Sequence, residues 1–127
     1  MAAILIVDDD PTVRAIAKEI LKVDGHSMVE AGDGLEALAL VERLPIDVVI
    51  VDMLMPRMDG LETIRALRSR HRPPSIIAIS SGGLLDADRL LQMASTSGAD
   101  ATLQKPLRLA TLRDTLTTVL SRMAVVH

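Results

Sequence analysis

Four acidic residues follow two apolar stretches, and their positions suit the binding of a hard metal ion. Asp8, Asp9 and Asp10 come directly after one stretch, and Asp52 ends the other. Strands that are apolar throughout are typical of a parallel sheet, whose strands point their carboxyl ends to one edge. We therefore expect Asp8, Asp9 and Asp52 to meet at that edge. Two carboxylates about 4 Å apart repel by roughly 4 kcal/mol at an effective dielectric near 20, so the cluster requires a cation or a protonated carboxyl.

Two later loops carry groups that suit a phosphoryl group. Ser80 and Ser81 follow the fourth predicted strand, and Lys105 and Pro106 follow the fifth. Serine offers a hydroxyl donor and lysine a compact positive charge. Carboxylates without His or Cys ligands suit Mg²⁺ or Mn²⁺ rather than zinc. Each loop alone is an ordinary turn, but their occurrence at successive strand ends predicts phosphoryl transfer onto an Asp, a reaction catalysed mainly by positioning and charge neutralisation.

Five apolar segments alternate with five helical patterns. Strands are predicted at residues 3–7, 26–31, 46–51, 75–79 and 101–104. Asp10 with Pro11 predicts one helix start, and Asp33 with Glu36 predicts a capping box at another. Strands that alternate with helices imply right-handed crossovers and a parallel sheet with helices on both faces. The sequence predicts one three-layer α/β domain over residues 1–127.

Helical spacing selects the side chains that we expect to face the core. In the first, second and last helices these are Val13, Ile16, Ala17, Ile20 and Leu21, then Leu38, Val41 and Leu44, and then Leu109, Leu112, Leu116, Val119 and Leu120. The core must be built from aliphatic residues, because the chain contains no Phe, Tyr or Trp.

Composition excludes several classes of function. The net charge of −3 gives no general attraction to nucleic acid or to a membrane surface. The absence of cysteine excludes disulfides, thiolate metal sites and thiol catalysis. The sequence shows neither a signal segment nor an apolar run near the ~18 residues of a membrane span, so the expected location is the cytoplasm.

The chain resembles the response-regulator receiver domains, the family of the bacterial chemotaxis receiver. The resemblance extends from Ile4 to about Met123. The segments that carry it are Ile6-Val7-Asp8-Asp9-Asp10, Asp52-Met53-Leu54-Met55-Pro56-Arg57-Met58-Asp59-Gly60, Ile79-Ser80-Ser81 and Lys105-Pro106. The resemblance implies a doubly wound, flavodoxin-like (βα)5 fold with five parallel strands in the order 2-1-3-4-5. It also implies a signalling domain that catalyses only its own phosphorylation and dephosphorylation, and is not otherwise an enzyme.

The resemblance assigns roles to individual residues. Asp52 corresponds to the phosphoacceptor. Asp9 and Asp52 would bind Mg²⁺ directly, Leu54 would bind it through its backbone carbonyl, and Asp8 largely through water. Asp59 belongs to the matching segment, and we expect it to start a helix.

Further roles concern the phosphoryl group and the switch. Ser80 would move toward a phosphoryl oxygen, and Lys105 would pair with the acyl phosphate through a loop whose Lys105-Pro106 peptide is typically cis. Thr102 stands where receivers usually carry an aromatic switch residue, and Leu107 where they often have Phe. A ring that swings inward therefore cannot signal in this chain. The remaining candidates for the switch are Ser80, the Gly82-Gly83 loop, Leu90, Met93 and Leu107.

Partners follow from the same resemblance. The phosphoryl donor would be a histidine kinase or a histidine phosphotransfer protein, docking near Pro11, Thr12, Val13, Ile16, Pro106 and Leu107. The downstream protein is not identified by the sequence, and no direct contact with nucleic acid is expected. The face formed by the fourth helix, fifth strand and fifth helix could support a homodimer. The chain could stand alone or form one module of a longer protein.

Three other interpretations compete with this one. A phosphatase of the haloacid-dehalogenase type needs a second Asp two residues after the first, where this chain has Leu54. A flavodoxin-like FMN carrier would place a phosphate against Asp8, Asp9 and Asp10, and this chain has no aromatic residue to cover the flavin. A degenerate receiver that binds partners without phosphorylation is the remaining alternative, and the complete acidic, hydroxyl and lysine set argues against it.

Overall fold

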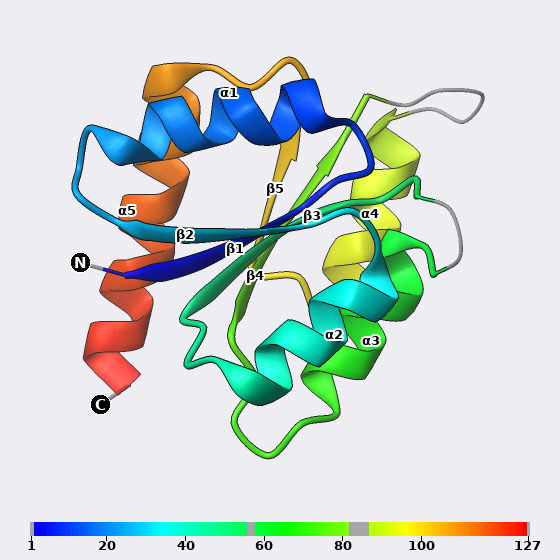
Figure 1. Ribbon diagram of the computed structural model, residues 1–127. Helices are drawn as coiled ribbons and strands as arrows, with labels where there is room; N and C mark the ends of the chain where they lie inside the picture. Colours follow the sequence, from blue (N-terminus) through cyan, green and yellow to red (C-terminus); the bar gives the residue numbers. More distant parts are fainter. Residues whose placement is uncertain (1, 56–57, 82–86, 127) are drawn as a thin grey trace.

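Five strands alternate with five helices along the whole chain (Figure 1). The computed structural model describes residues 2–55, 58–81 and 87–126. The elements are β1 (Ala3–Val7), α1 (Pro11–Lys22), β2 (Ser27–Ala31), α2 (Gly34–Arg43), β3 (Val48–Asp52), α3 (Gly60–Arg68), β4 (Ser75–Ser80), α4 (Ala87–Ser97), β5 (Ala101–Gln104) and α5 (Leu109–Val126).

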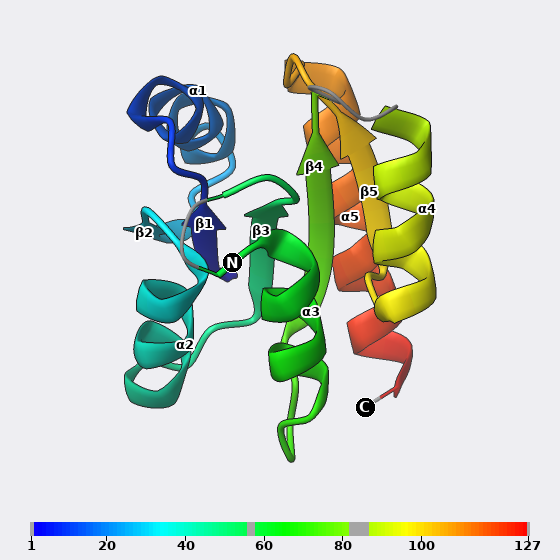
Figure 2. The ribbon, with the colours of Figure 1, turned by 90° about the vertical axis from the view of Figure 1, so that its right-hand side faces the viewer.

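The strands form one parallel sheet in the order β2-β1-β3-β4-β5 (Figure 2). This order confirms the predicted doubly wound, flavodoxin-like architecture. The chain starts near the middle of the sheet, adds β2 on one side and then crosses β1 to build β3, β4 and β5 on the other. The carboxyl ends of β1 and β3 are therefore neighbours, which is the condition for their acidic residues to meet.

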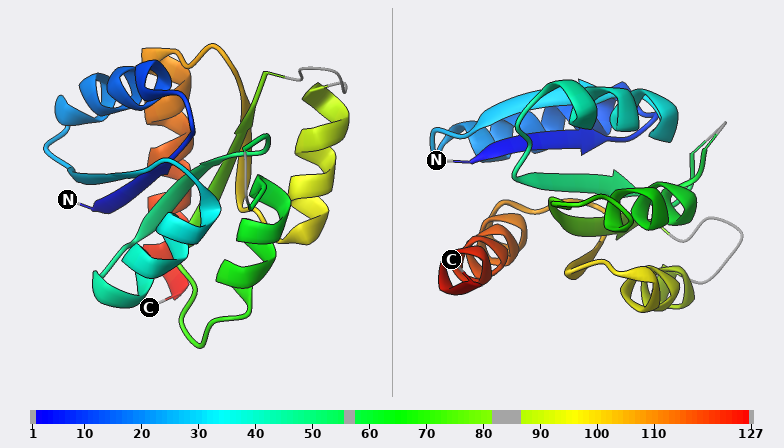
Figure 3. Two further views of the ribbon diagram at one scale, coloured as in Figure 1. Left: turned by 45° about the vertical axis from the view of Figure 1, so that its right-hand side comes forward. Right: turned by 90° about the horizontal axis from the view of Figure 1, so that it is seen from below.

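Two cores lie on opposite faces of the sheet (Figure 3). Helices α1 and α5 cover one face, and α2, α3 and α4 cover the other. Alternate residues of β1 serve each core, because successive side chains of a strand point to opposite faces: Ile4 and Ile6 pack toward α1 and α5, and Leu5 and Val7 pack toward α2 and α3. Coverage on both faces explains why the strands are apolar without interruption.

Three predicted strands have different bounds in the structure. β2 begins at Ser27 rather than at position 26, because its pairing with β1 starts where Ser27 lies opposite Ala3, the first residue of β1. β3 begins at Val48 rather than at position 46, because its pairing with β1 starts where Val48 lies opposite Ile4. β3 and β4 each extend one residue further than predicted, so Asp52 and Ser80 end strands instead of belonging to loops.

Acidic residues cap three helices as the sequence predicts. Asp10 accepts a hydrogen bond from Thr12 N at 2.9 Å, and Asp59 accepts one from Glu62 N at 2.8 Å. Asp33 accepts one from Glu36 N at 2.9 Å, which is half of a capping box. The return bond differs from the predicted pattern, because the Glu36 carboxylate accepts from Gly32 N, one residue before the cap.

Three side chains that we expected to face the core are exposed. Leu44 is 38% exposed because it is the C-cap of α2 and its extended backbone takes it off the helical face. Ile16 is 45% exposed and Leu109 is 50% exposed. Ala17, Leu21, Leu112, Leu116 and Val119 are buried as predicted. No helix within the described ranges combines the length and the apolar character needed to cross a membrane.

The start of α3 lies directly against the end of β3. The N–H of Gly60 donates to the carbonyl oxygen of Met53 at 3.2 Å. A Cβ atom at position 60 would overlap the carbonyl oxygen of Asp52 and would lie 2.5 Å from the Cα of Met53. The neighbours are backbone atoms, which cannot rotate away as the end of a side chain can. Glycine is therefore required here by close packing.

We expect Gly60→Ala to destabilise the protein by about 2 kcal/mol, because overpacking against fixed atoms typically costs about 1–3 kcal/mol. Urea unfolding monitored by far-UV circular dichroism measures the change. Gly32→Ala is the matched control, since a Cβ there meets only side-chain ends at 3.8 and 3.9 Å. The control should stabilise the fold slightly, by about 0.5 kcal/mol, through the lower entropy of its unfolded chain. Equal losses in both variants would contradict the packing assignment.

Candidate functional site

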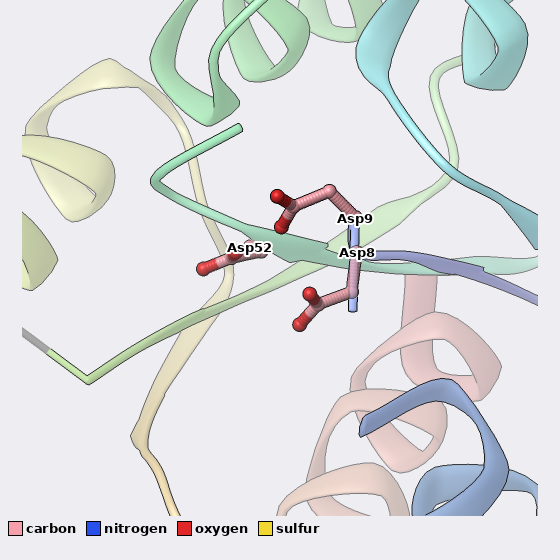
Figure 4. A group of neighbouring side chains, drawn as sticks. All are labelled: Asp8, Asp9 and Asp52. Atoms are coloured by element: carbon pink, nitrogen blue, oxygen red, sulfur yellow. The ribbon is translucent and has the colours of Figure 1, made fainter. Parts of the chain in front are cut away.

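Three carboxylates meet at the carboxyl ends of β1 and β3, as the sequence predicts (Figure 4). Asp8, Asp9 and Asp52 each offer one oxygen, and these oxygens all lie within 4.8 Å of one another. In Figure 4 the three side chains extend to the same side of the end of β1. Asp8 is fully buried and Asp52 is 4% exposed, whereas Asp9 is exposed to solvent.

Asp8 is fixed by its own backbone and by one carboxylate oxygen. Its N–H donates to Ala31 O at 3.1 Å, which continues the pairing of β1 with β2. Its Oδ1 accepts a hydrogen bond from Asp10 N at 2.9 Å, so the loop closes over it. Its Oδ2 is buried and accepts no hydrogen bond within the described part of the chain. The carboxylate is thus held in place with one oxygen directed at the cluster.

Lys105 supplies positive charge to this cluster. Its Nζ lies 2.8 Å from Asp8 Oδ2 and 3.5 Å from Asp52 Oδ2. The shorter contact is an ion pair, which makes Lys105 the charged partner of the buried Asp8 Oδ2. Burial alone would lower the pKa of Lys105, but its contacts with the two carboxylates outweigh burial and raise this pKa. Lys105 is therefore charged at neutral pH.

Burial makes the charged form of Asp52 unfavourable. Burial, reinforced by the charge of Asp8, raises the pKa of Asp52 from 3.8 to about 6, although Lys105 acts in the opposite direction. The N–H of Leu54 donates weakly to Asp52 Oδ1 at 3.4 Å. Leu54 therefore lies next to the cluster, with its own side chain 42% exposed. Pro56 and Arg57, which belong to the same predicted segment, lie outside the described residues.

The predicted hydroxyl and lysine loops lie at the same edge of the sheet. Ser80 is fully buried at the end of β4, and its carbonyl oxygen accepts the Lys105 N–H at 2.9 Å, so the two loops are paired. Ser81 is exposed. The Lys105-Pro106 peptide is cis, in agreement with the prediction, and the Pro106 side chain is exposed.

The predicted switch positions occupy different environments. Thr102 is half-buried on β5, opposite Ala78 of β4. Leu107 is partly buried against the core beneath α1 and α5. Leu90 is buried, whereas Met93 is 42% exposed. The Gly82-Gly83 loop lies outside the described residues.

Arg14 contacts the acidic loop, although it was not among the predicted site residues. Its guanidinium donates to the carbonyl oxygen of Asp8 at 2.6 Å and to Glu30 at 3.1 Å. A usable signal was present, because a side chain in the first turns of a helix leans back toward the helix start. The helix that begins after Asp10 therefore brings Arg14 back over the acidic loop.

The donor set fits a hard divalent cation. All three converging groups are carboxylates, so the cluster offers only oxygen atoms to an ion. Among the residues that the structure describes, Lys105 is the cationic side chain in contact with these carboxylates. Its single charge does not balance three negative charges. The cluster can therefore bind a metal ion, and carboxylate ligands favour ions such as Mg²⁺ over softer metals.

The family model for the response regulator receiver domain matches residues 4–117. The chain belongs to this family. A receiver domain is a signalling module of two-component systems rather than an enzyme, and it implies a cognate histidine kinase.

Individual relatives agree with this assignment. The transcriptional regulatory protein CpxR of Escherichia coli (strain K12) is 38% identical over 106 residues, which are 84% of this chain and 44% of that protein. The response regulator MprA of Mycobacterium sp. (strain KMS) is 37% identical over 119 residues, which are 94% of this chain and 50% of that protein. The receiver domain thus spans half or less of the length of these curated relatives.

Solved structures agree as well. The Vibrio cholerae chemotaxis protein CheY4 superimposes with a TM-score of 0.82 at 32% identity, covering 94% of this chain and 98% of that one. A receiver domain protein from Clostridium thermocellum superimposes with a TM-score of 0.89 at 28% identity, over 100% of both chains. These solved chains share the fold of this receiver domain along nearly their whole length.

The raised pKa of Asp52 predicts how stability depends on pH without metal. Between pH 4 and 6 the folded protein holds a proton on Asp52 that the unfolded chain has released, so this residue's contribution to stability falls as pH rises. Asp52→Asn removes that dependence. We expect the free energy of unfolding of Asp52→Asn to match that of wild type near pH 4. At pH 7 it should exceed the wild-type value by on the order of 1 kcal/mol.

Urea unfolding of both proteins in EDTA at a series of pH values measures this difference. All other titrating groups are shared, so the difference isolates position 52. If the difference in unfolding free energy between the variant and wild type stays constant from pH 4 to 7, or decreases as pH rises, this would contradict a raised pKa for Asp52.

Proposed function

We propose that this receiver domain accepts a phosphoryl group on Asp52 from a phospho-histidine donor and thereby changes its partner binding. The observation that carries the proposal is the convergence of three carboxylates within 4.8 Å, with Lys105 Nζ 3.5 Å from Asp52 Oδ2. The pairing of a carboxylate nucleophile with a fixed cation suits a reaction whose catalysis depends on position and charge. We propose that residues 1–127 form one such domain.

We propose Mg²⁺ as the resident ion, with Mn²⁺ as a substitute. Asp9 and Asp52 would bind it directly, the Leu54 carbonyl would be a further ligand, and Asp8 would act largely through water. The ion would neutralise phosphoryl oxygens and reduce the repulsion within the cluster. The three converging carboxylates support this assignment, because oxygen ligands suit such an ion and Lys105, which pairs with Asp8 Oδ2, offsets only one of their charges.

The transfer is a substitution at phosphorus. A carboxylate oxygen of Asp52 forms the new P–O bond, the P–N bond to the donor histidine breaks, and the imidazole leaves with the bonding electron pair and takes up a proton. Lys105 would pair with an oxygen of the resulting acyl phosphate, and the Ser80 hydroxyl would move toward another. The pairing of the two loops through the Ser80 carbonyl and the Lys105 N–H supports a joint response.

Two surfaces and a set of switch residues between them are proposed to carry the signal. The histidine kinase or histidine phosphotransfer protein would dock near the start of α1 and Pro106, where Ile16 is exposed. The switch would act through Ser80, Ser81, Leu107 and the α4 side chains, since Thr102 has no ring to move. The face made of α4, β5 and α5 would then bind a downstream protein or a second copy. No direct contact with nucleic acid is proposed for this domain.

Phosphorylation by a small donor tests the proposal. With Mg²⁺ and acetyl phosphate, intact-mass spectrometry should show one added phosphoryl group, and Asp52→Asn should remove it because the amide is not a nucleophile at neutral pH. EDTA should also abolish labelling. Phosphorus NMR gives an independent measurement, and tryptophan fluorescence cannot, since the chain has no Trp.

Asp10→Asn is the matched control for this experiment. Asp10 lies two residues from Asp8 but caps α1, and asparagine caps a helix equally well. This variant should label at the wild-type rate. Labelling that persists in Asp52→Asn would refute Asp52 as acceptor, and a wild-type protein that never labels would favour the degenerate receiver that acts without phosphorylation.

A further inference from the structure

We propose that Arg14 is a positioning residue that sets the place of the Asp9 carboxylate and thereby strengthens the binding of the divalent ion. This inference rests on the proposed function, because it takes the acidic cluster to be an ion site. Asp9 is the exposed member of the cluster. Within the described ranges no hydrogen bond or ion pair holds its side chain, so its position depends on the backbone that carries it.

Arg14 links that backbone to the neighbouring strand. Its Nη1 donates to the carbonyl oxygen of Asp8 at 2.6 Å, and its Nε donates to Glu30 Oε1 on β2 at 3.1 Å. The side chain of Arg14 is only 20% exposed, so the bridge is partly shielded from water. A guanidinium holds its donors in fixed directions, which lets one side chain satisfy two separate acceptors.

The bridge fixes the direction in which Asp9 leaves β1. The carbonyl of Asp8 and the N–H of Asp9 belong to one planar peptide group, so a restraint on the carbonyl also orients Asp9. The N–H of Asp8 donates directly to Ala31 O of β2. Both backbone polar groups of Asp8 are therefore tied to β2, one directly and one through Arg14 and Glu30.

Charge and geometry predict opposite effects when Arg14 is replaced. Removing a positive charge near three carboxylates would by Coulomb attraction alone strengthen the binding of a cation. Removing a group that orients a ligand weakens metal binding, by about 10–100-fold where such groups have been replaced. The sign of the change therefore separates a positioning role from a purely electrostatic one.

Lys18 provides a matched control. Its Nζ lies 3.0 Å from Glu30 Oε2, so it shares the partner of Arg14 but has no contact with Asp8. The hydrogen bond from Lys18, opposed by burial and reinforced by Arg14, lowers the pKa of Glu30, which is therefore an ionised partner for both. Lys18→Met removes the same charge as Arg14→Met and leaves the contact with the Asp8 carbonyl intact.

The test is a Mg²⁺ titration followed by the amide NMR signals of Asp9 and Asp52. Arg14→Met should raise the Kd for Mg²⁺ about tenfold. Lys18→Met should leave it unchanged or lower it. A Kd in Arg14→Met that equals or falls below the wild-type value would overturn the proposal. If the wild-type protein itself binds no Mg²⁺, the proposed function fails, which is a separate result.

Labelling by acetyl phosphate gives a second measurement that a general loss of structure would not reproduce. In Arg14→Met the Mg²⁺ concentration for half-maximal rate should rise about tenfold, while the rate at saturating Mg²⁺ stays within about twofold of wild type. A lower saturating rate with an unchanged Mg²⁺ requirement would overturn the proposal.

Arg14→Lys keeps the test decisive if Arg14→Met does not fold. It preserves the charge but not the planar fork that meets two acceptors at once. Its Kd for Mg²⁺ should exceed that of Lys18→Met. A Kd no higher than that of Lys18→Met would overturn the positioning role.

Discussion

The mutual repulsion of three carboxylates is the constraint around which this receiver domain is organised. Asp8 and Asp52 are removed from water and lie beside one another, and burial raises the pKa of Asp52 to about 6. Lys105 offsets part of this cost through contacts at 2.8 and 3.5 Å. The remaining negative charge is the reason why the cluster could bind a metal ion. The site is thus destabilising for the protein without metal, as functional sites commonly are.

The parallel sheet makes this arrangement possible, and other aspartates at the same edge cap helices instead. Parallel strands bring the ends of β1 and β3 together, and Gly60 lets α3 start directly against the backbone of Asp52. Other aspartates near the same edge, Asp10 and Asp59 among them, are engaged in capping helices. Their carboxylates accept backbone N–H groups and are not part of the cluster. Aspartate therefore joins a carboxylate cluster at the end of a strand and caps a helix at its start.

The chain contains no aromatic residue whose ring could move in response to a change at the site. A groove of about 440 Å³ next to Asp52 is lined partly by Met53, Met55 and Met93. Methionine side chains fill irregular space and repack without the single large displacement that a ring makes. Thr102 is half-buried on β5, and its side chain is too small to exchange two positions as a ring would. The proposed switch from Ser80 to the α4 face would then rely on aliphatic and thioether packing.

The sequence by itself determined the order of elements, the parallel sheet and the meeting of Asp8, Asp9 and Asp52, because apolar strands, cap residues and strand-end acids are local signals along the chain. It did not determine where Ile16, Leu44 and Leu109 lie, because the burial of a residue at the flank or end of a helix depends on what packs beside it. The bridge from Glu30 through Arg14 to the Asp8 carbonyl was likewise decided only by tertiary structure. Its members lie on β2, on α1 and in the loop between β1 and α1, and no spacing rule connects a strand residue to a helix residue that reaches it from another layer.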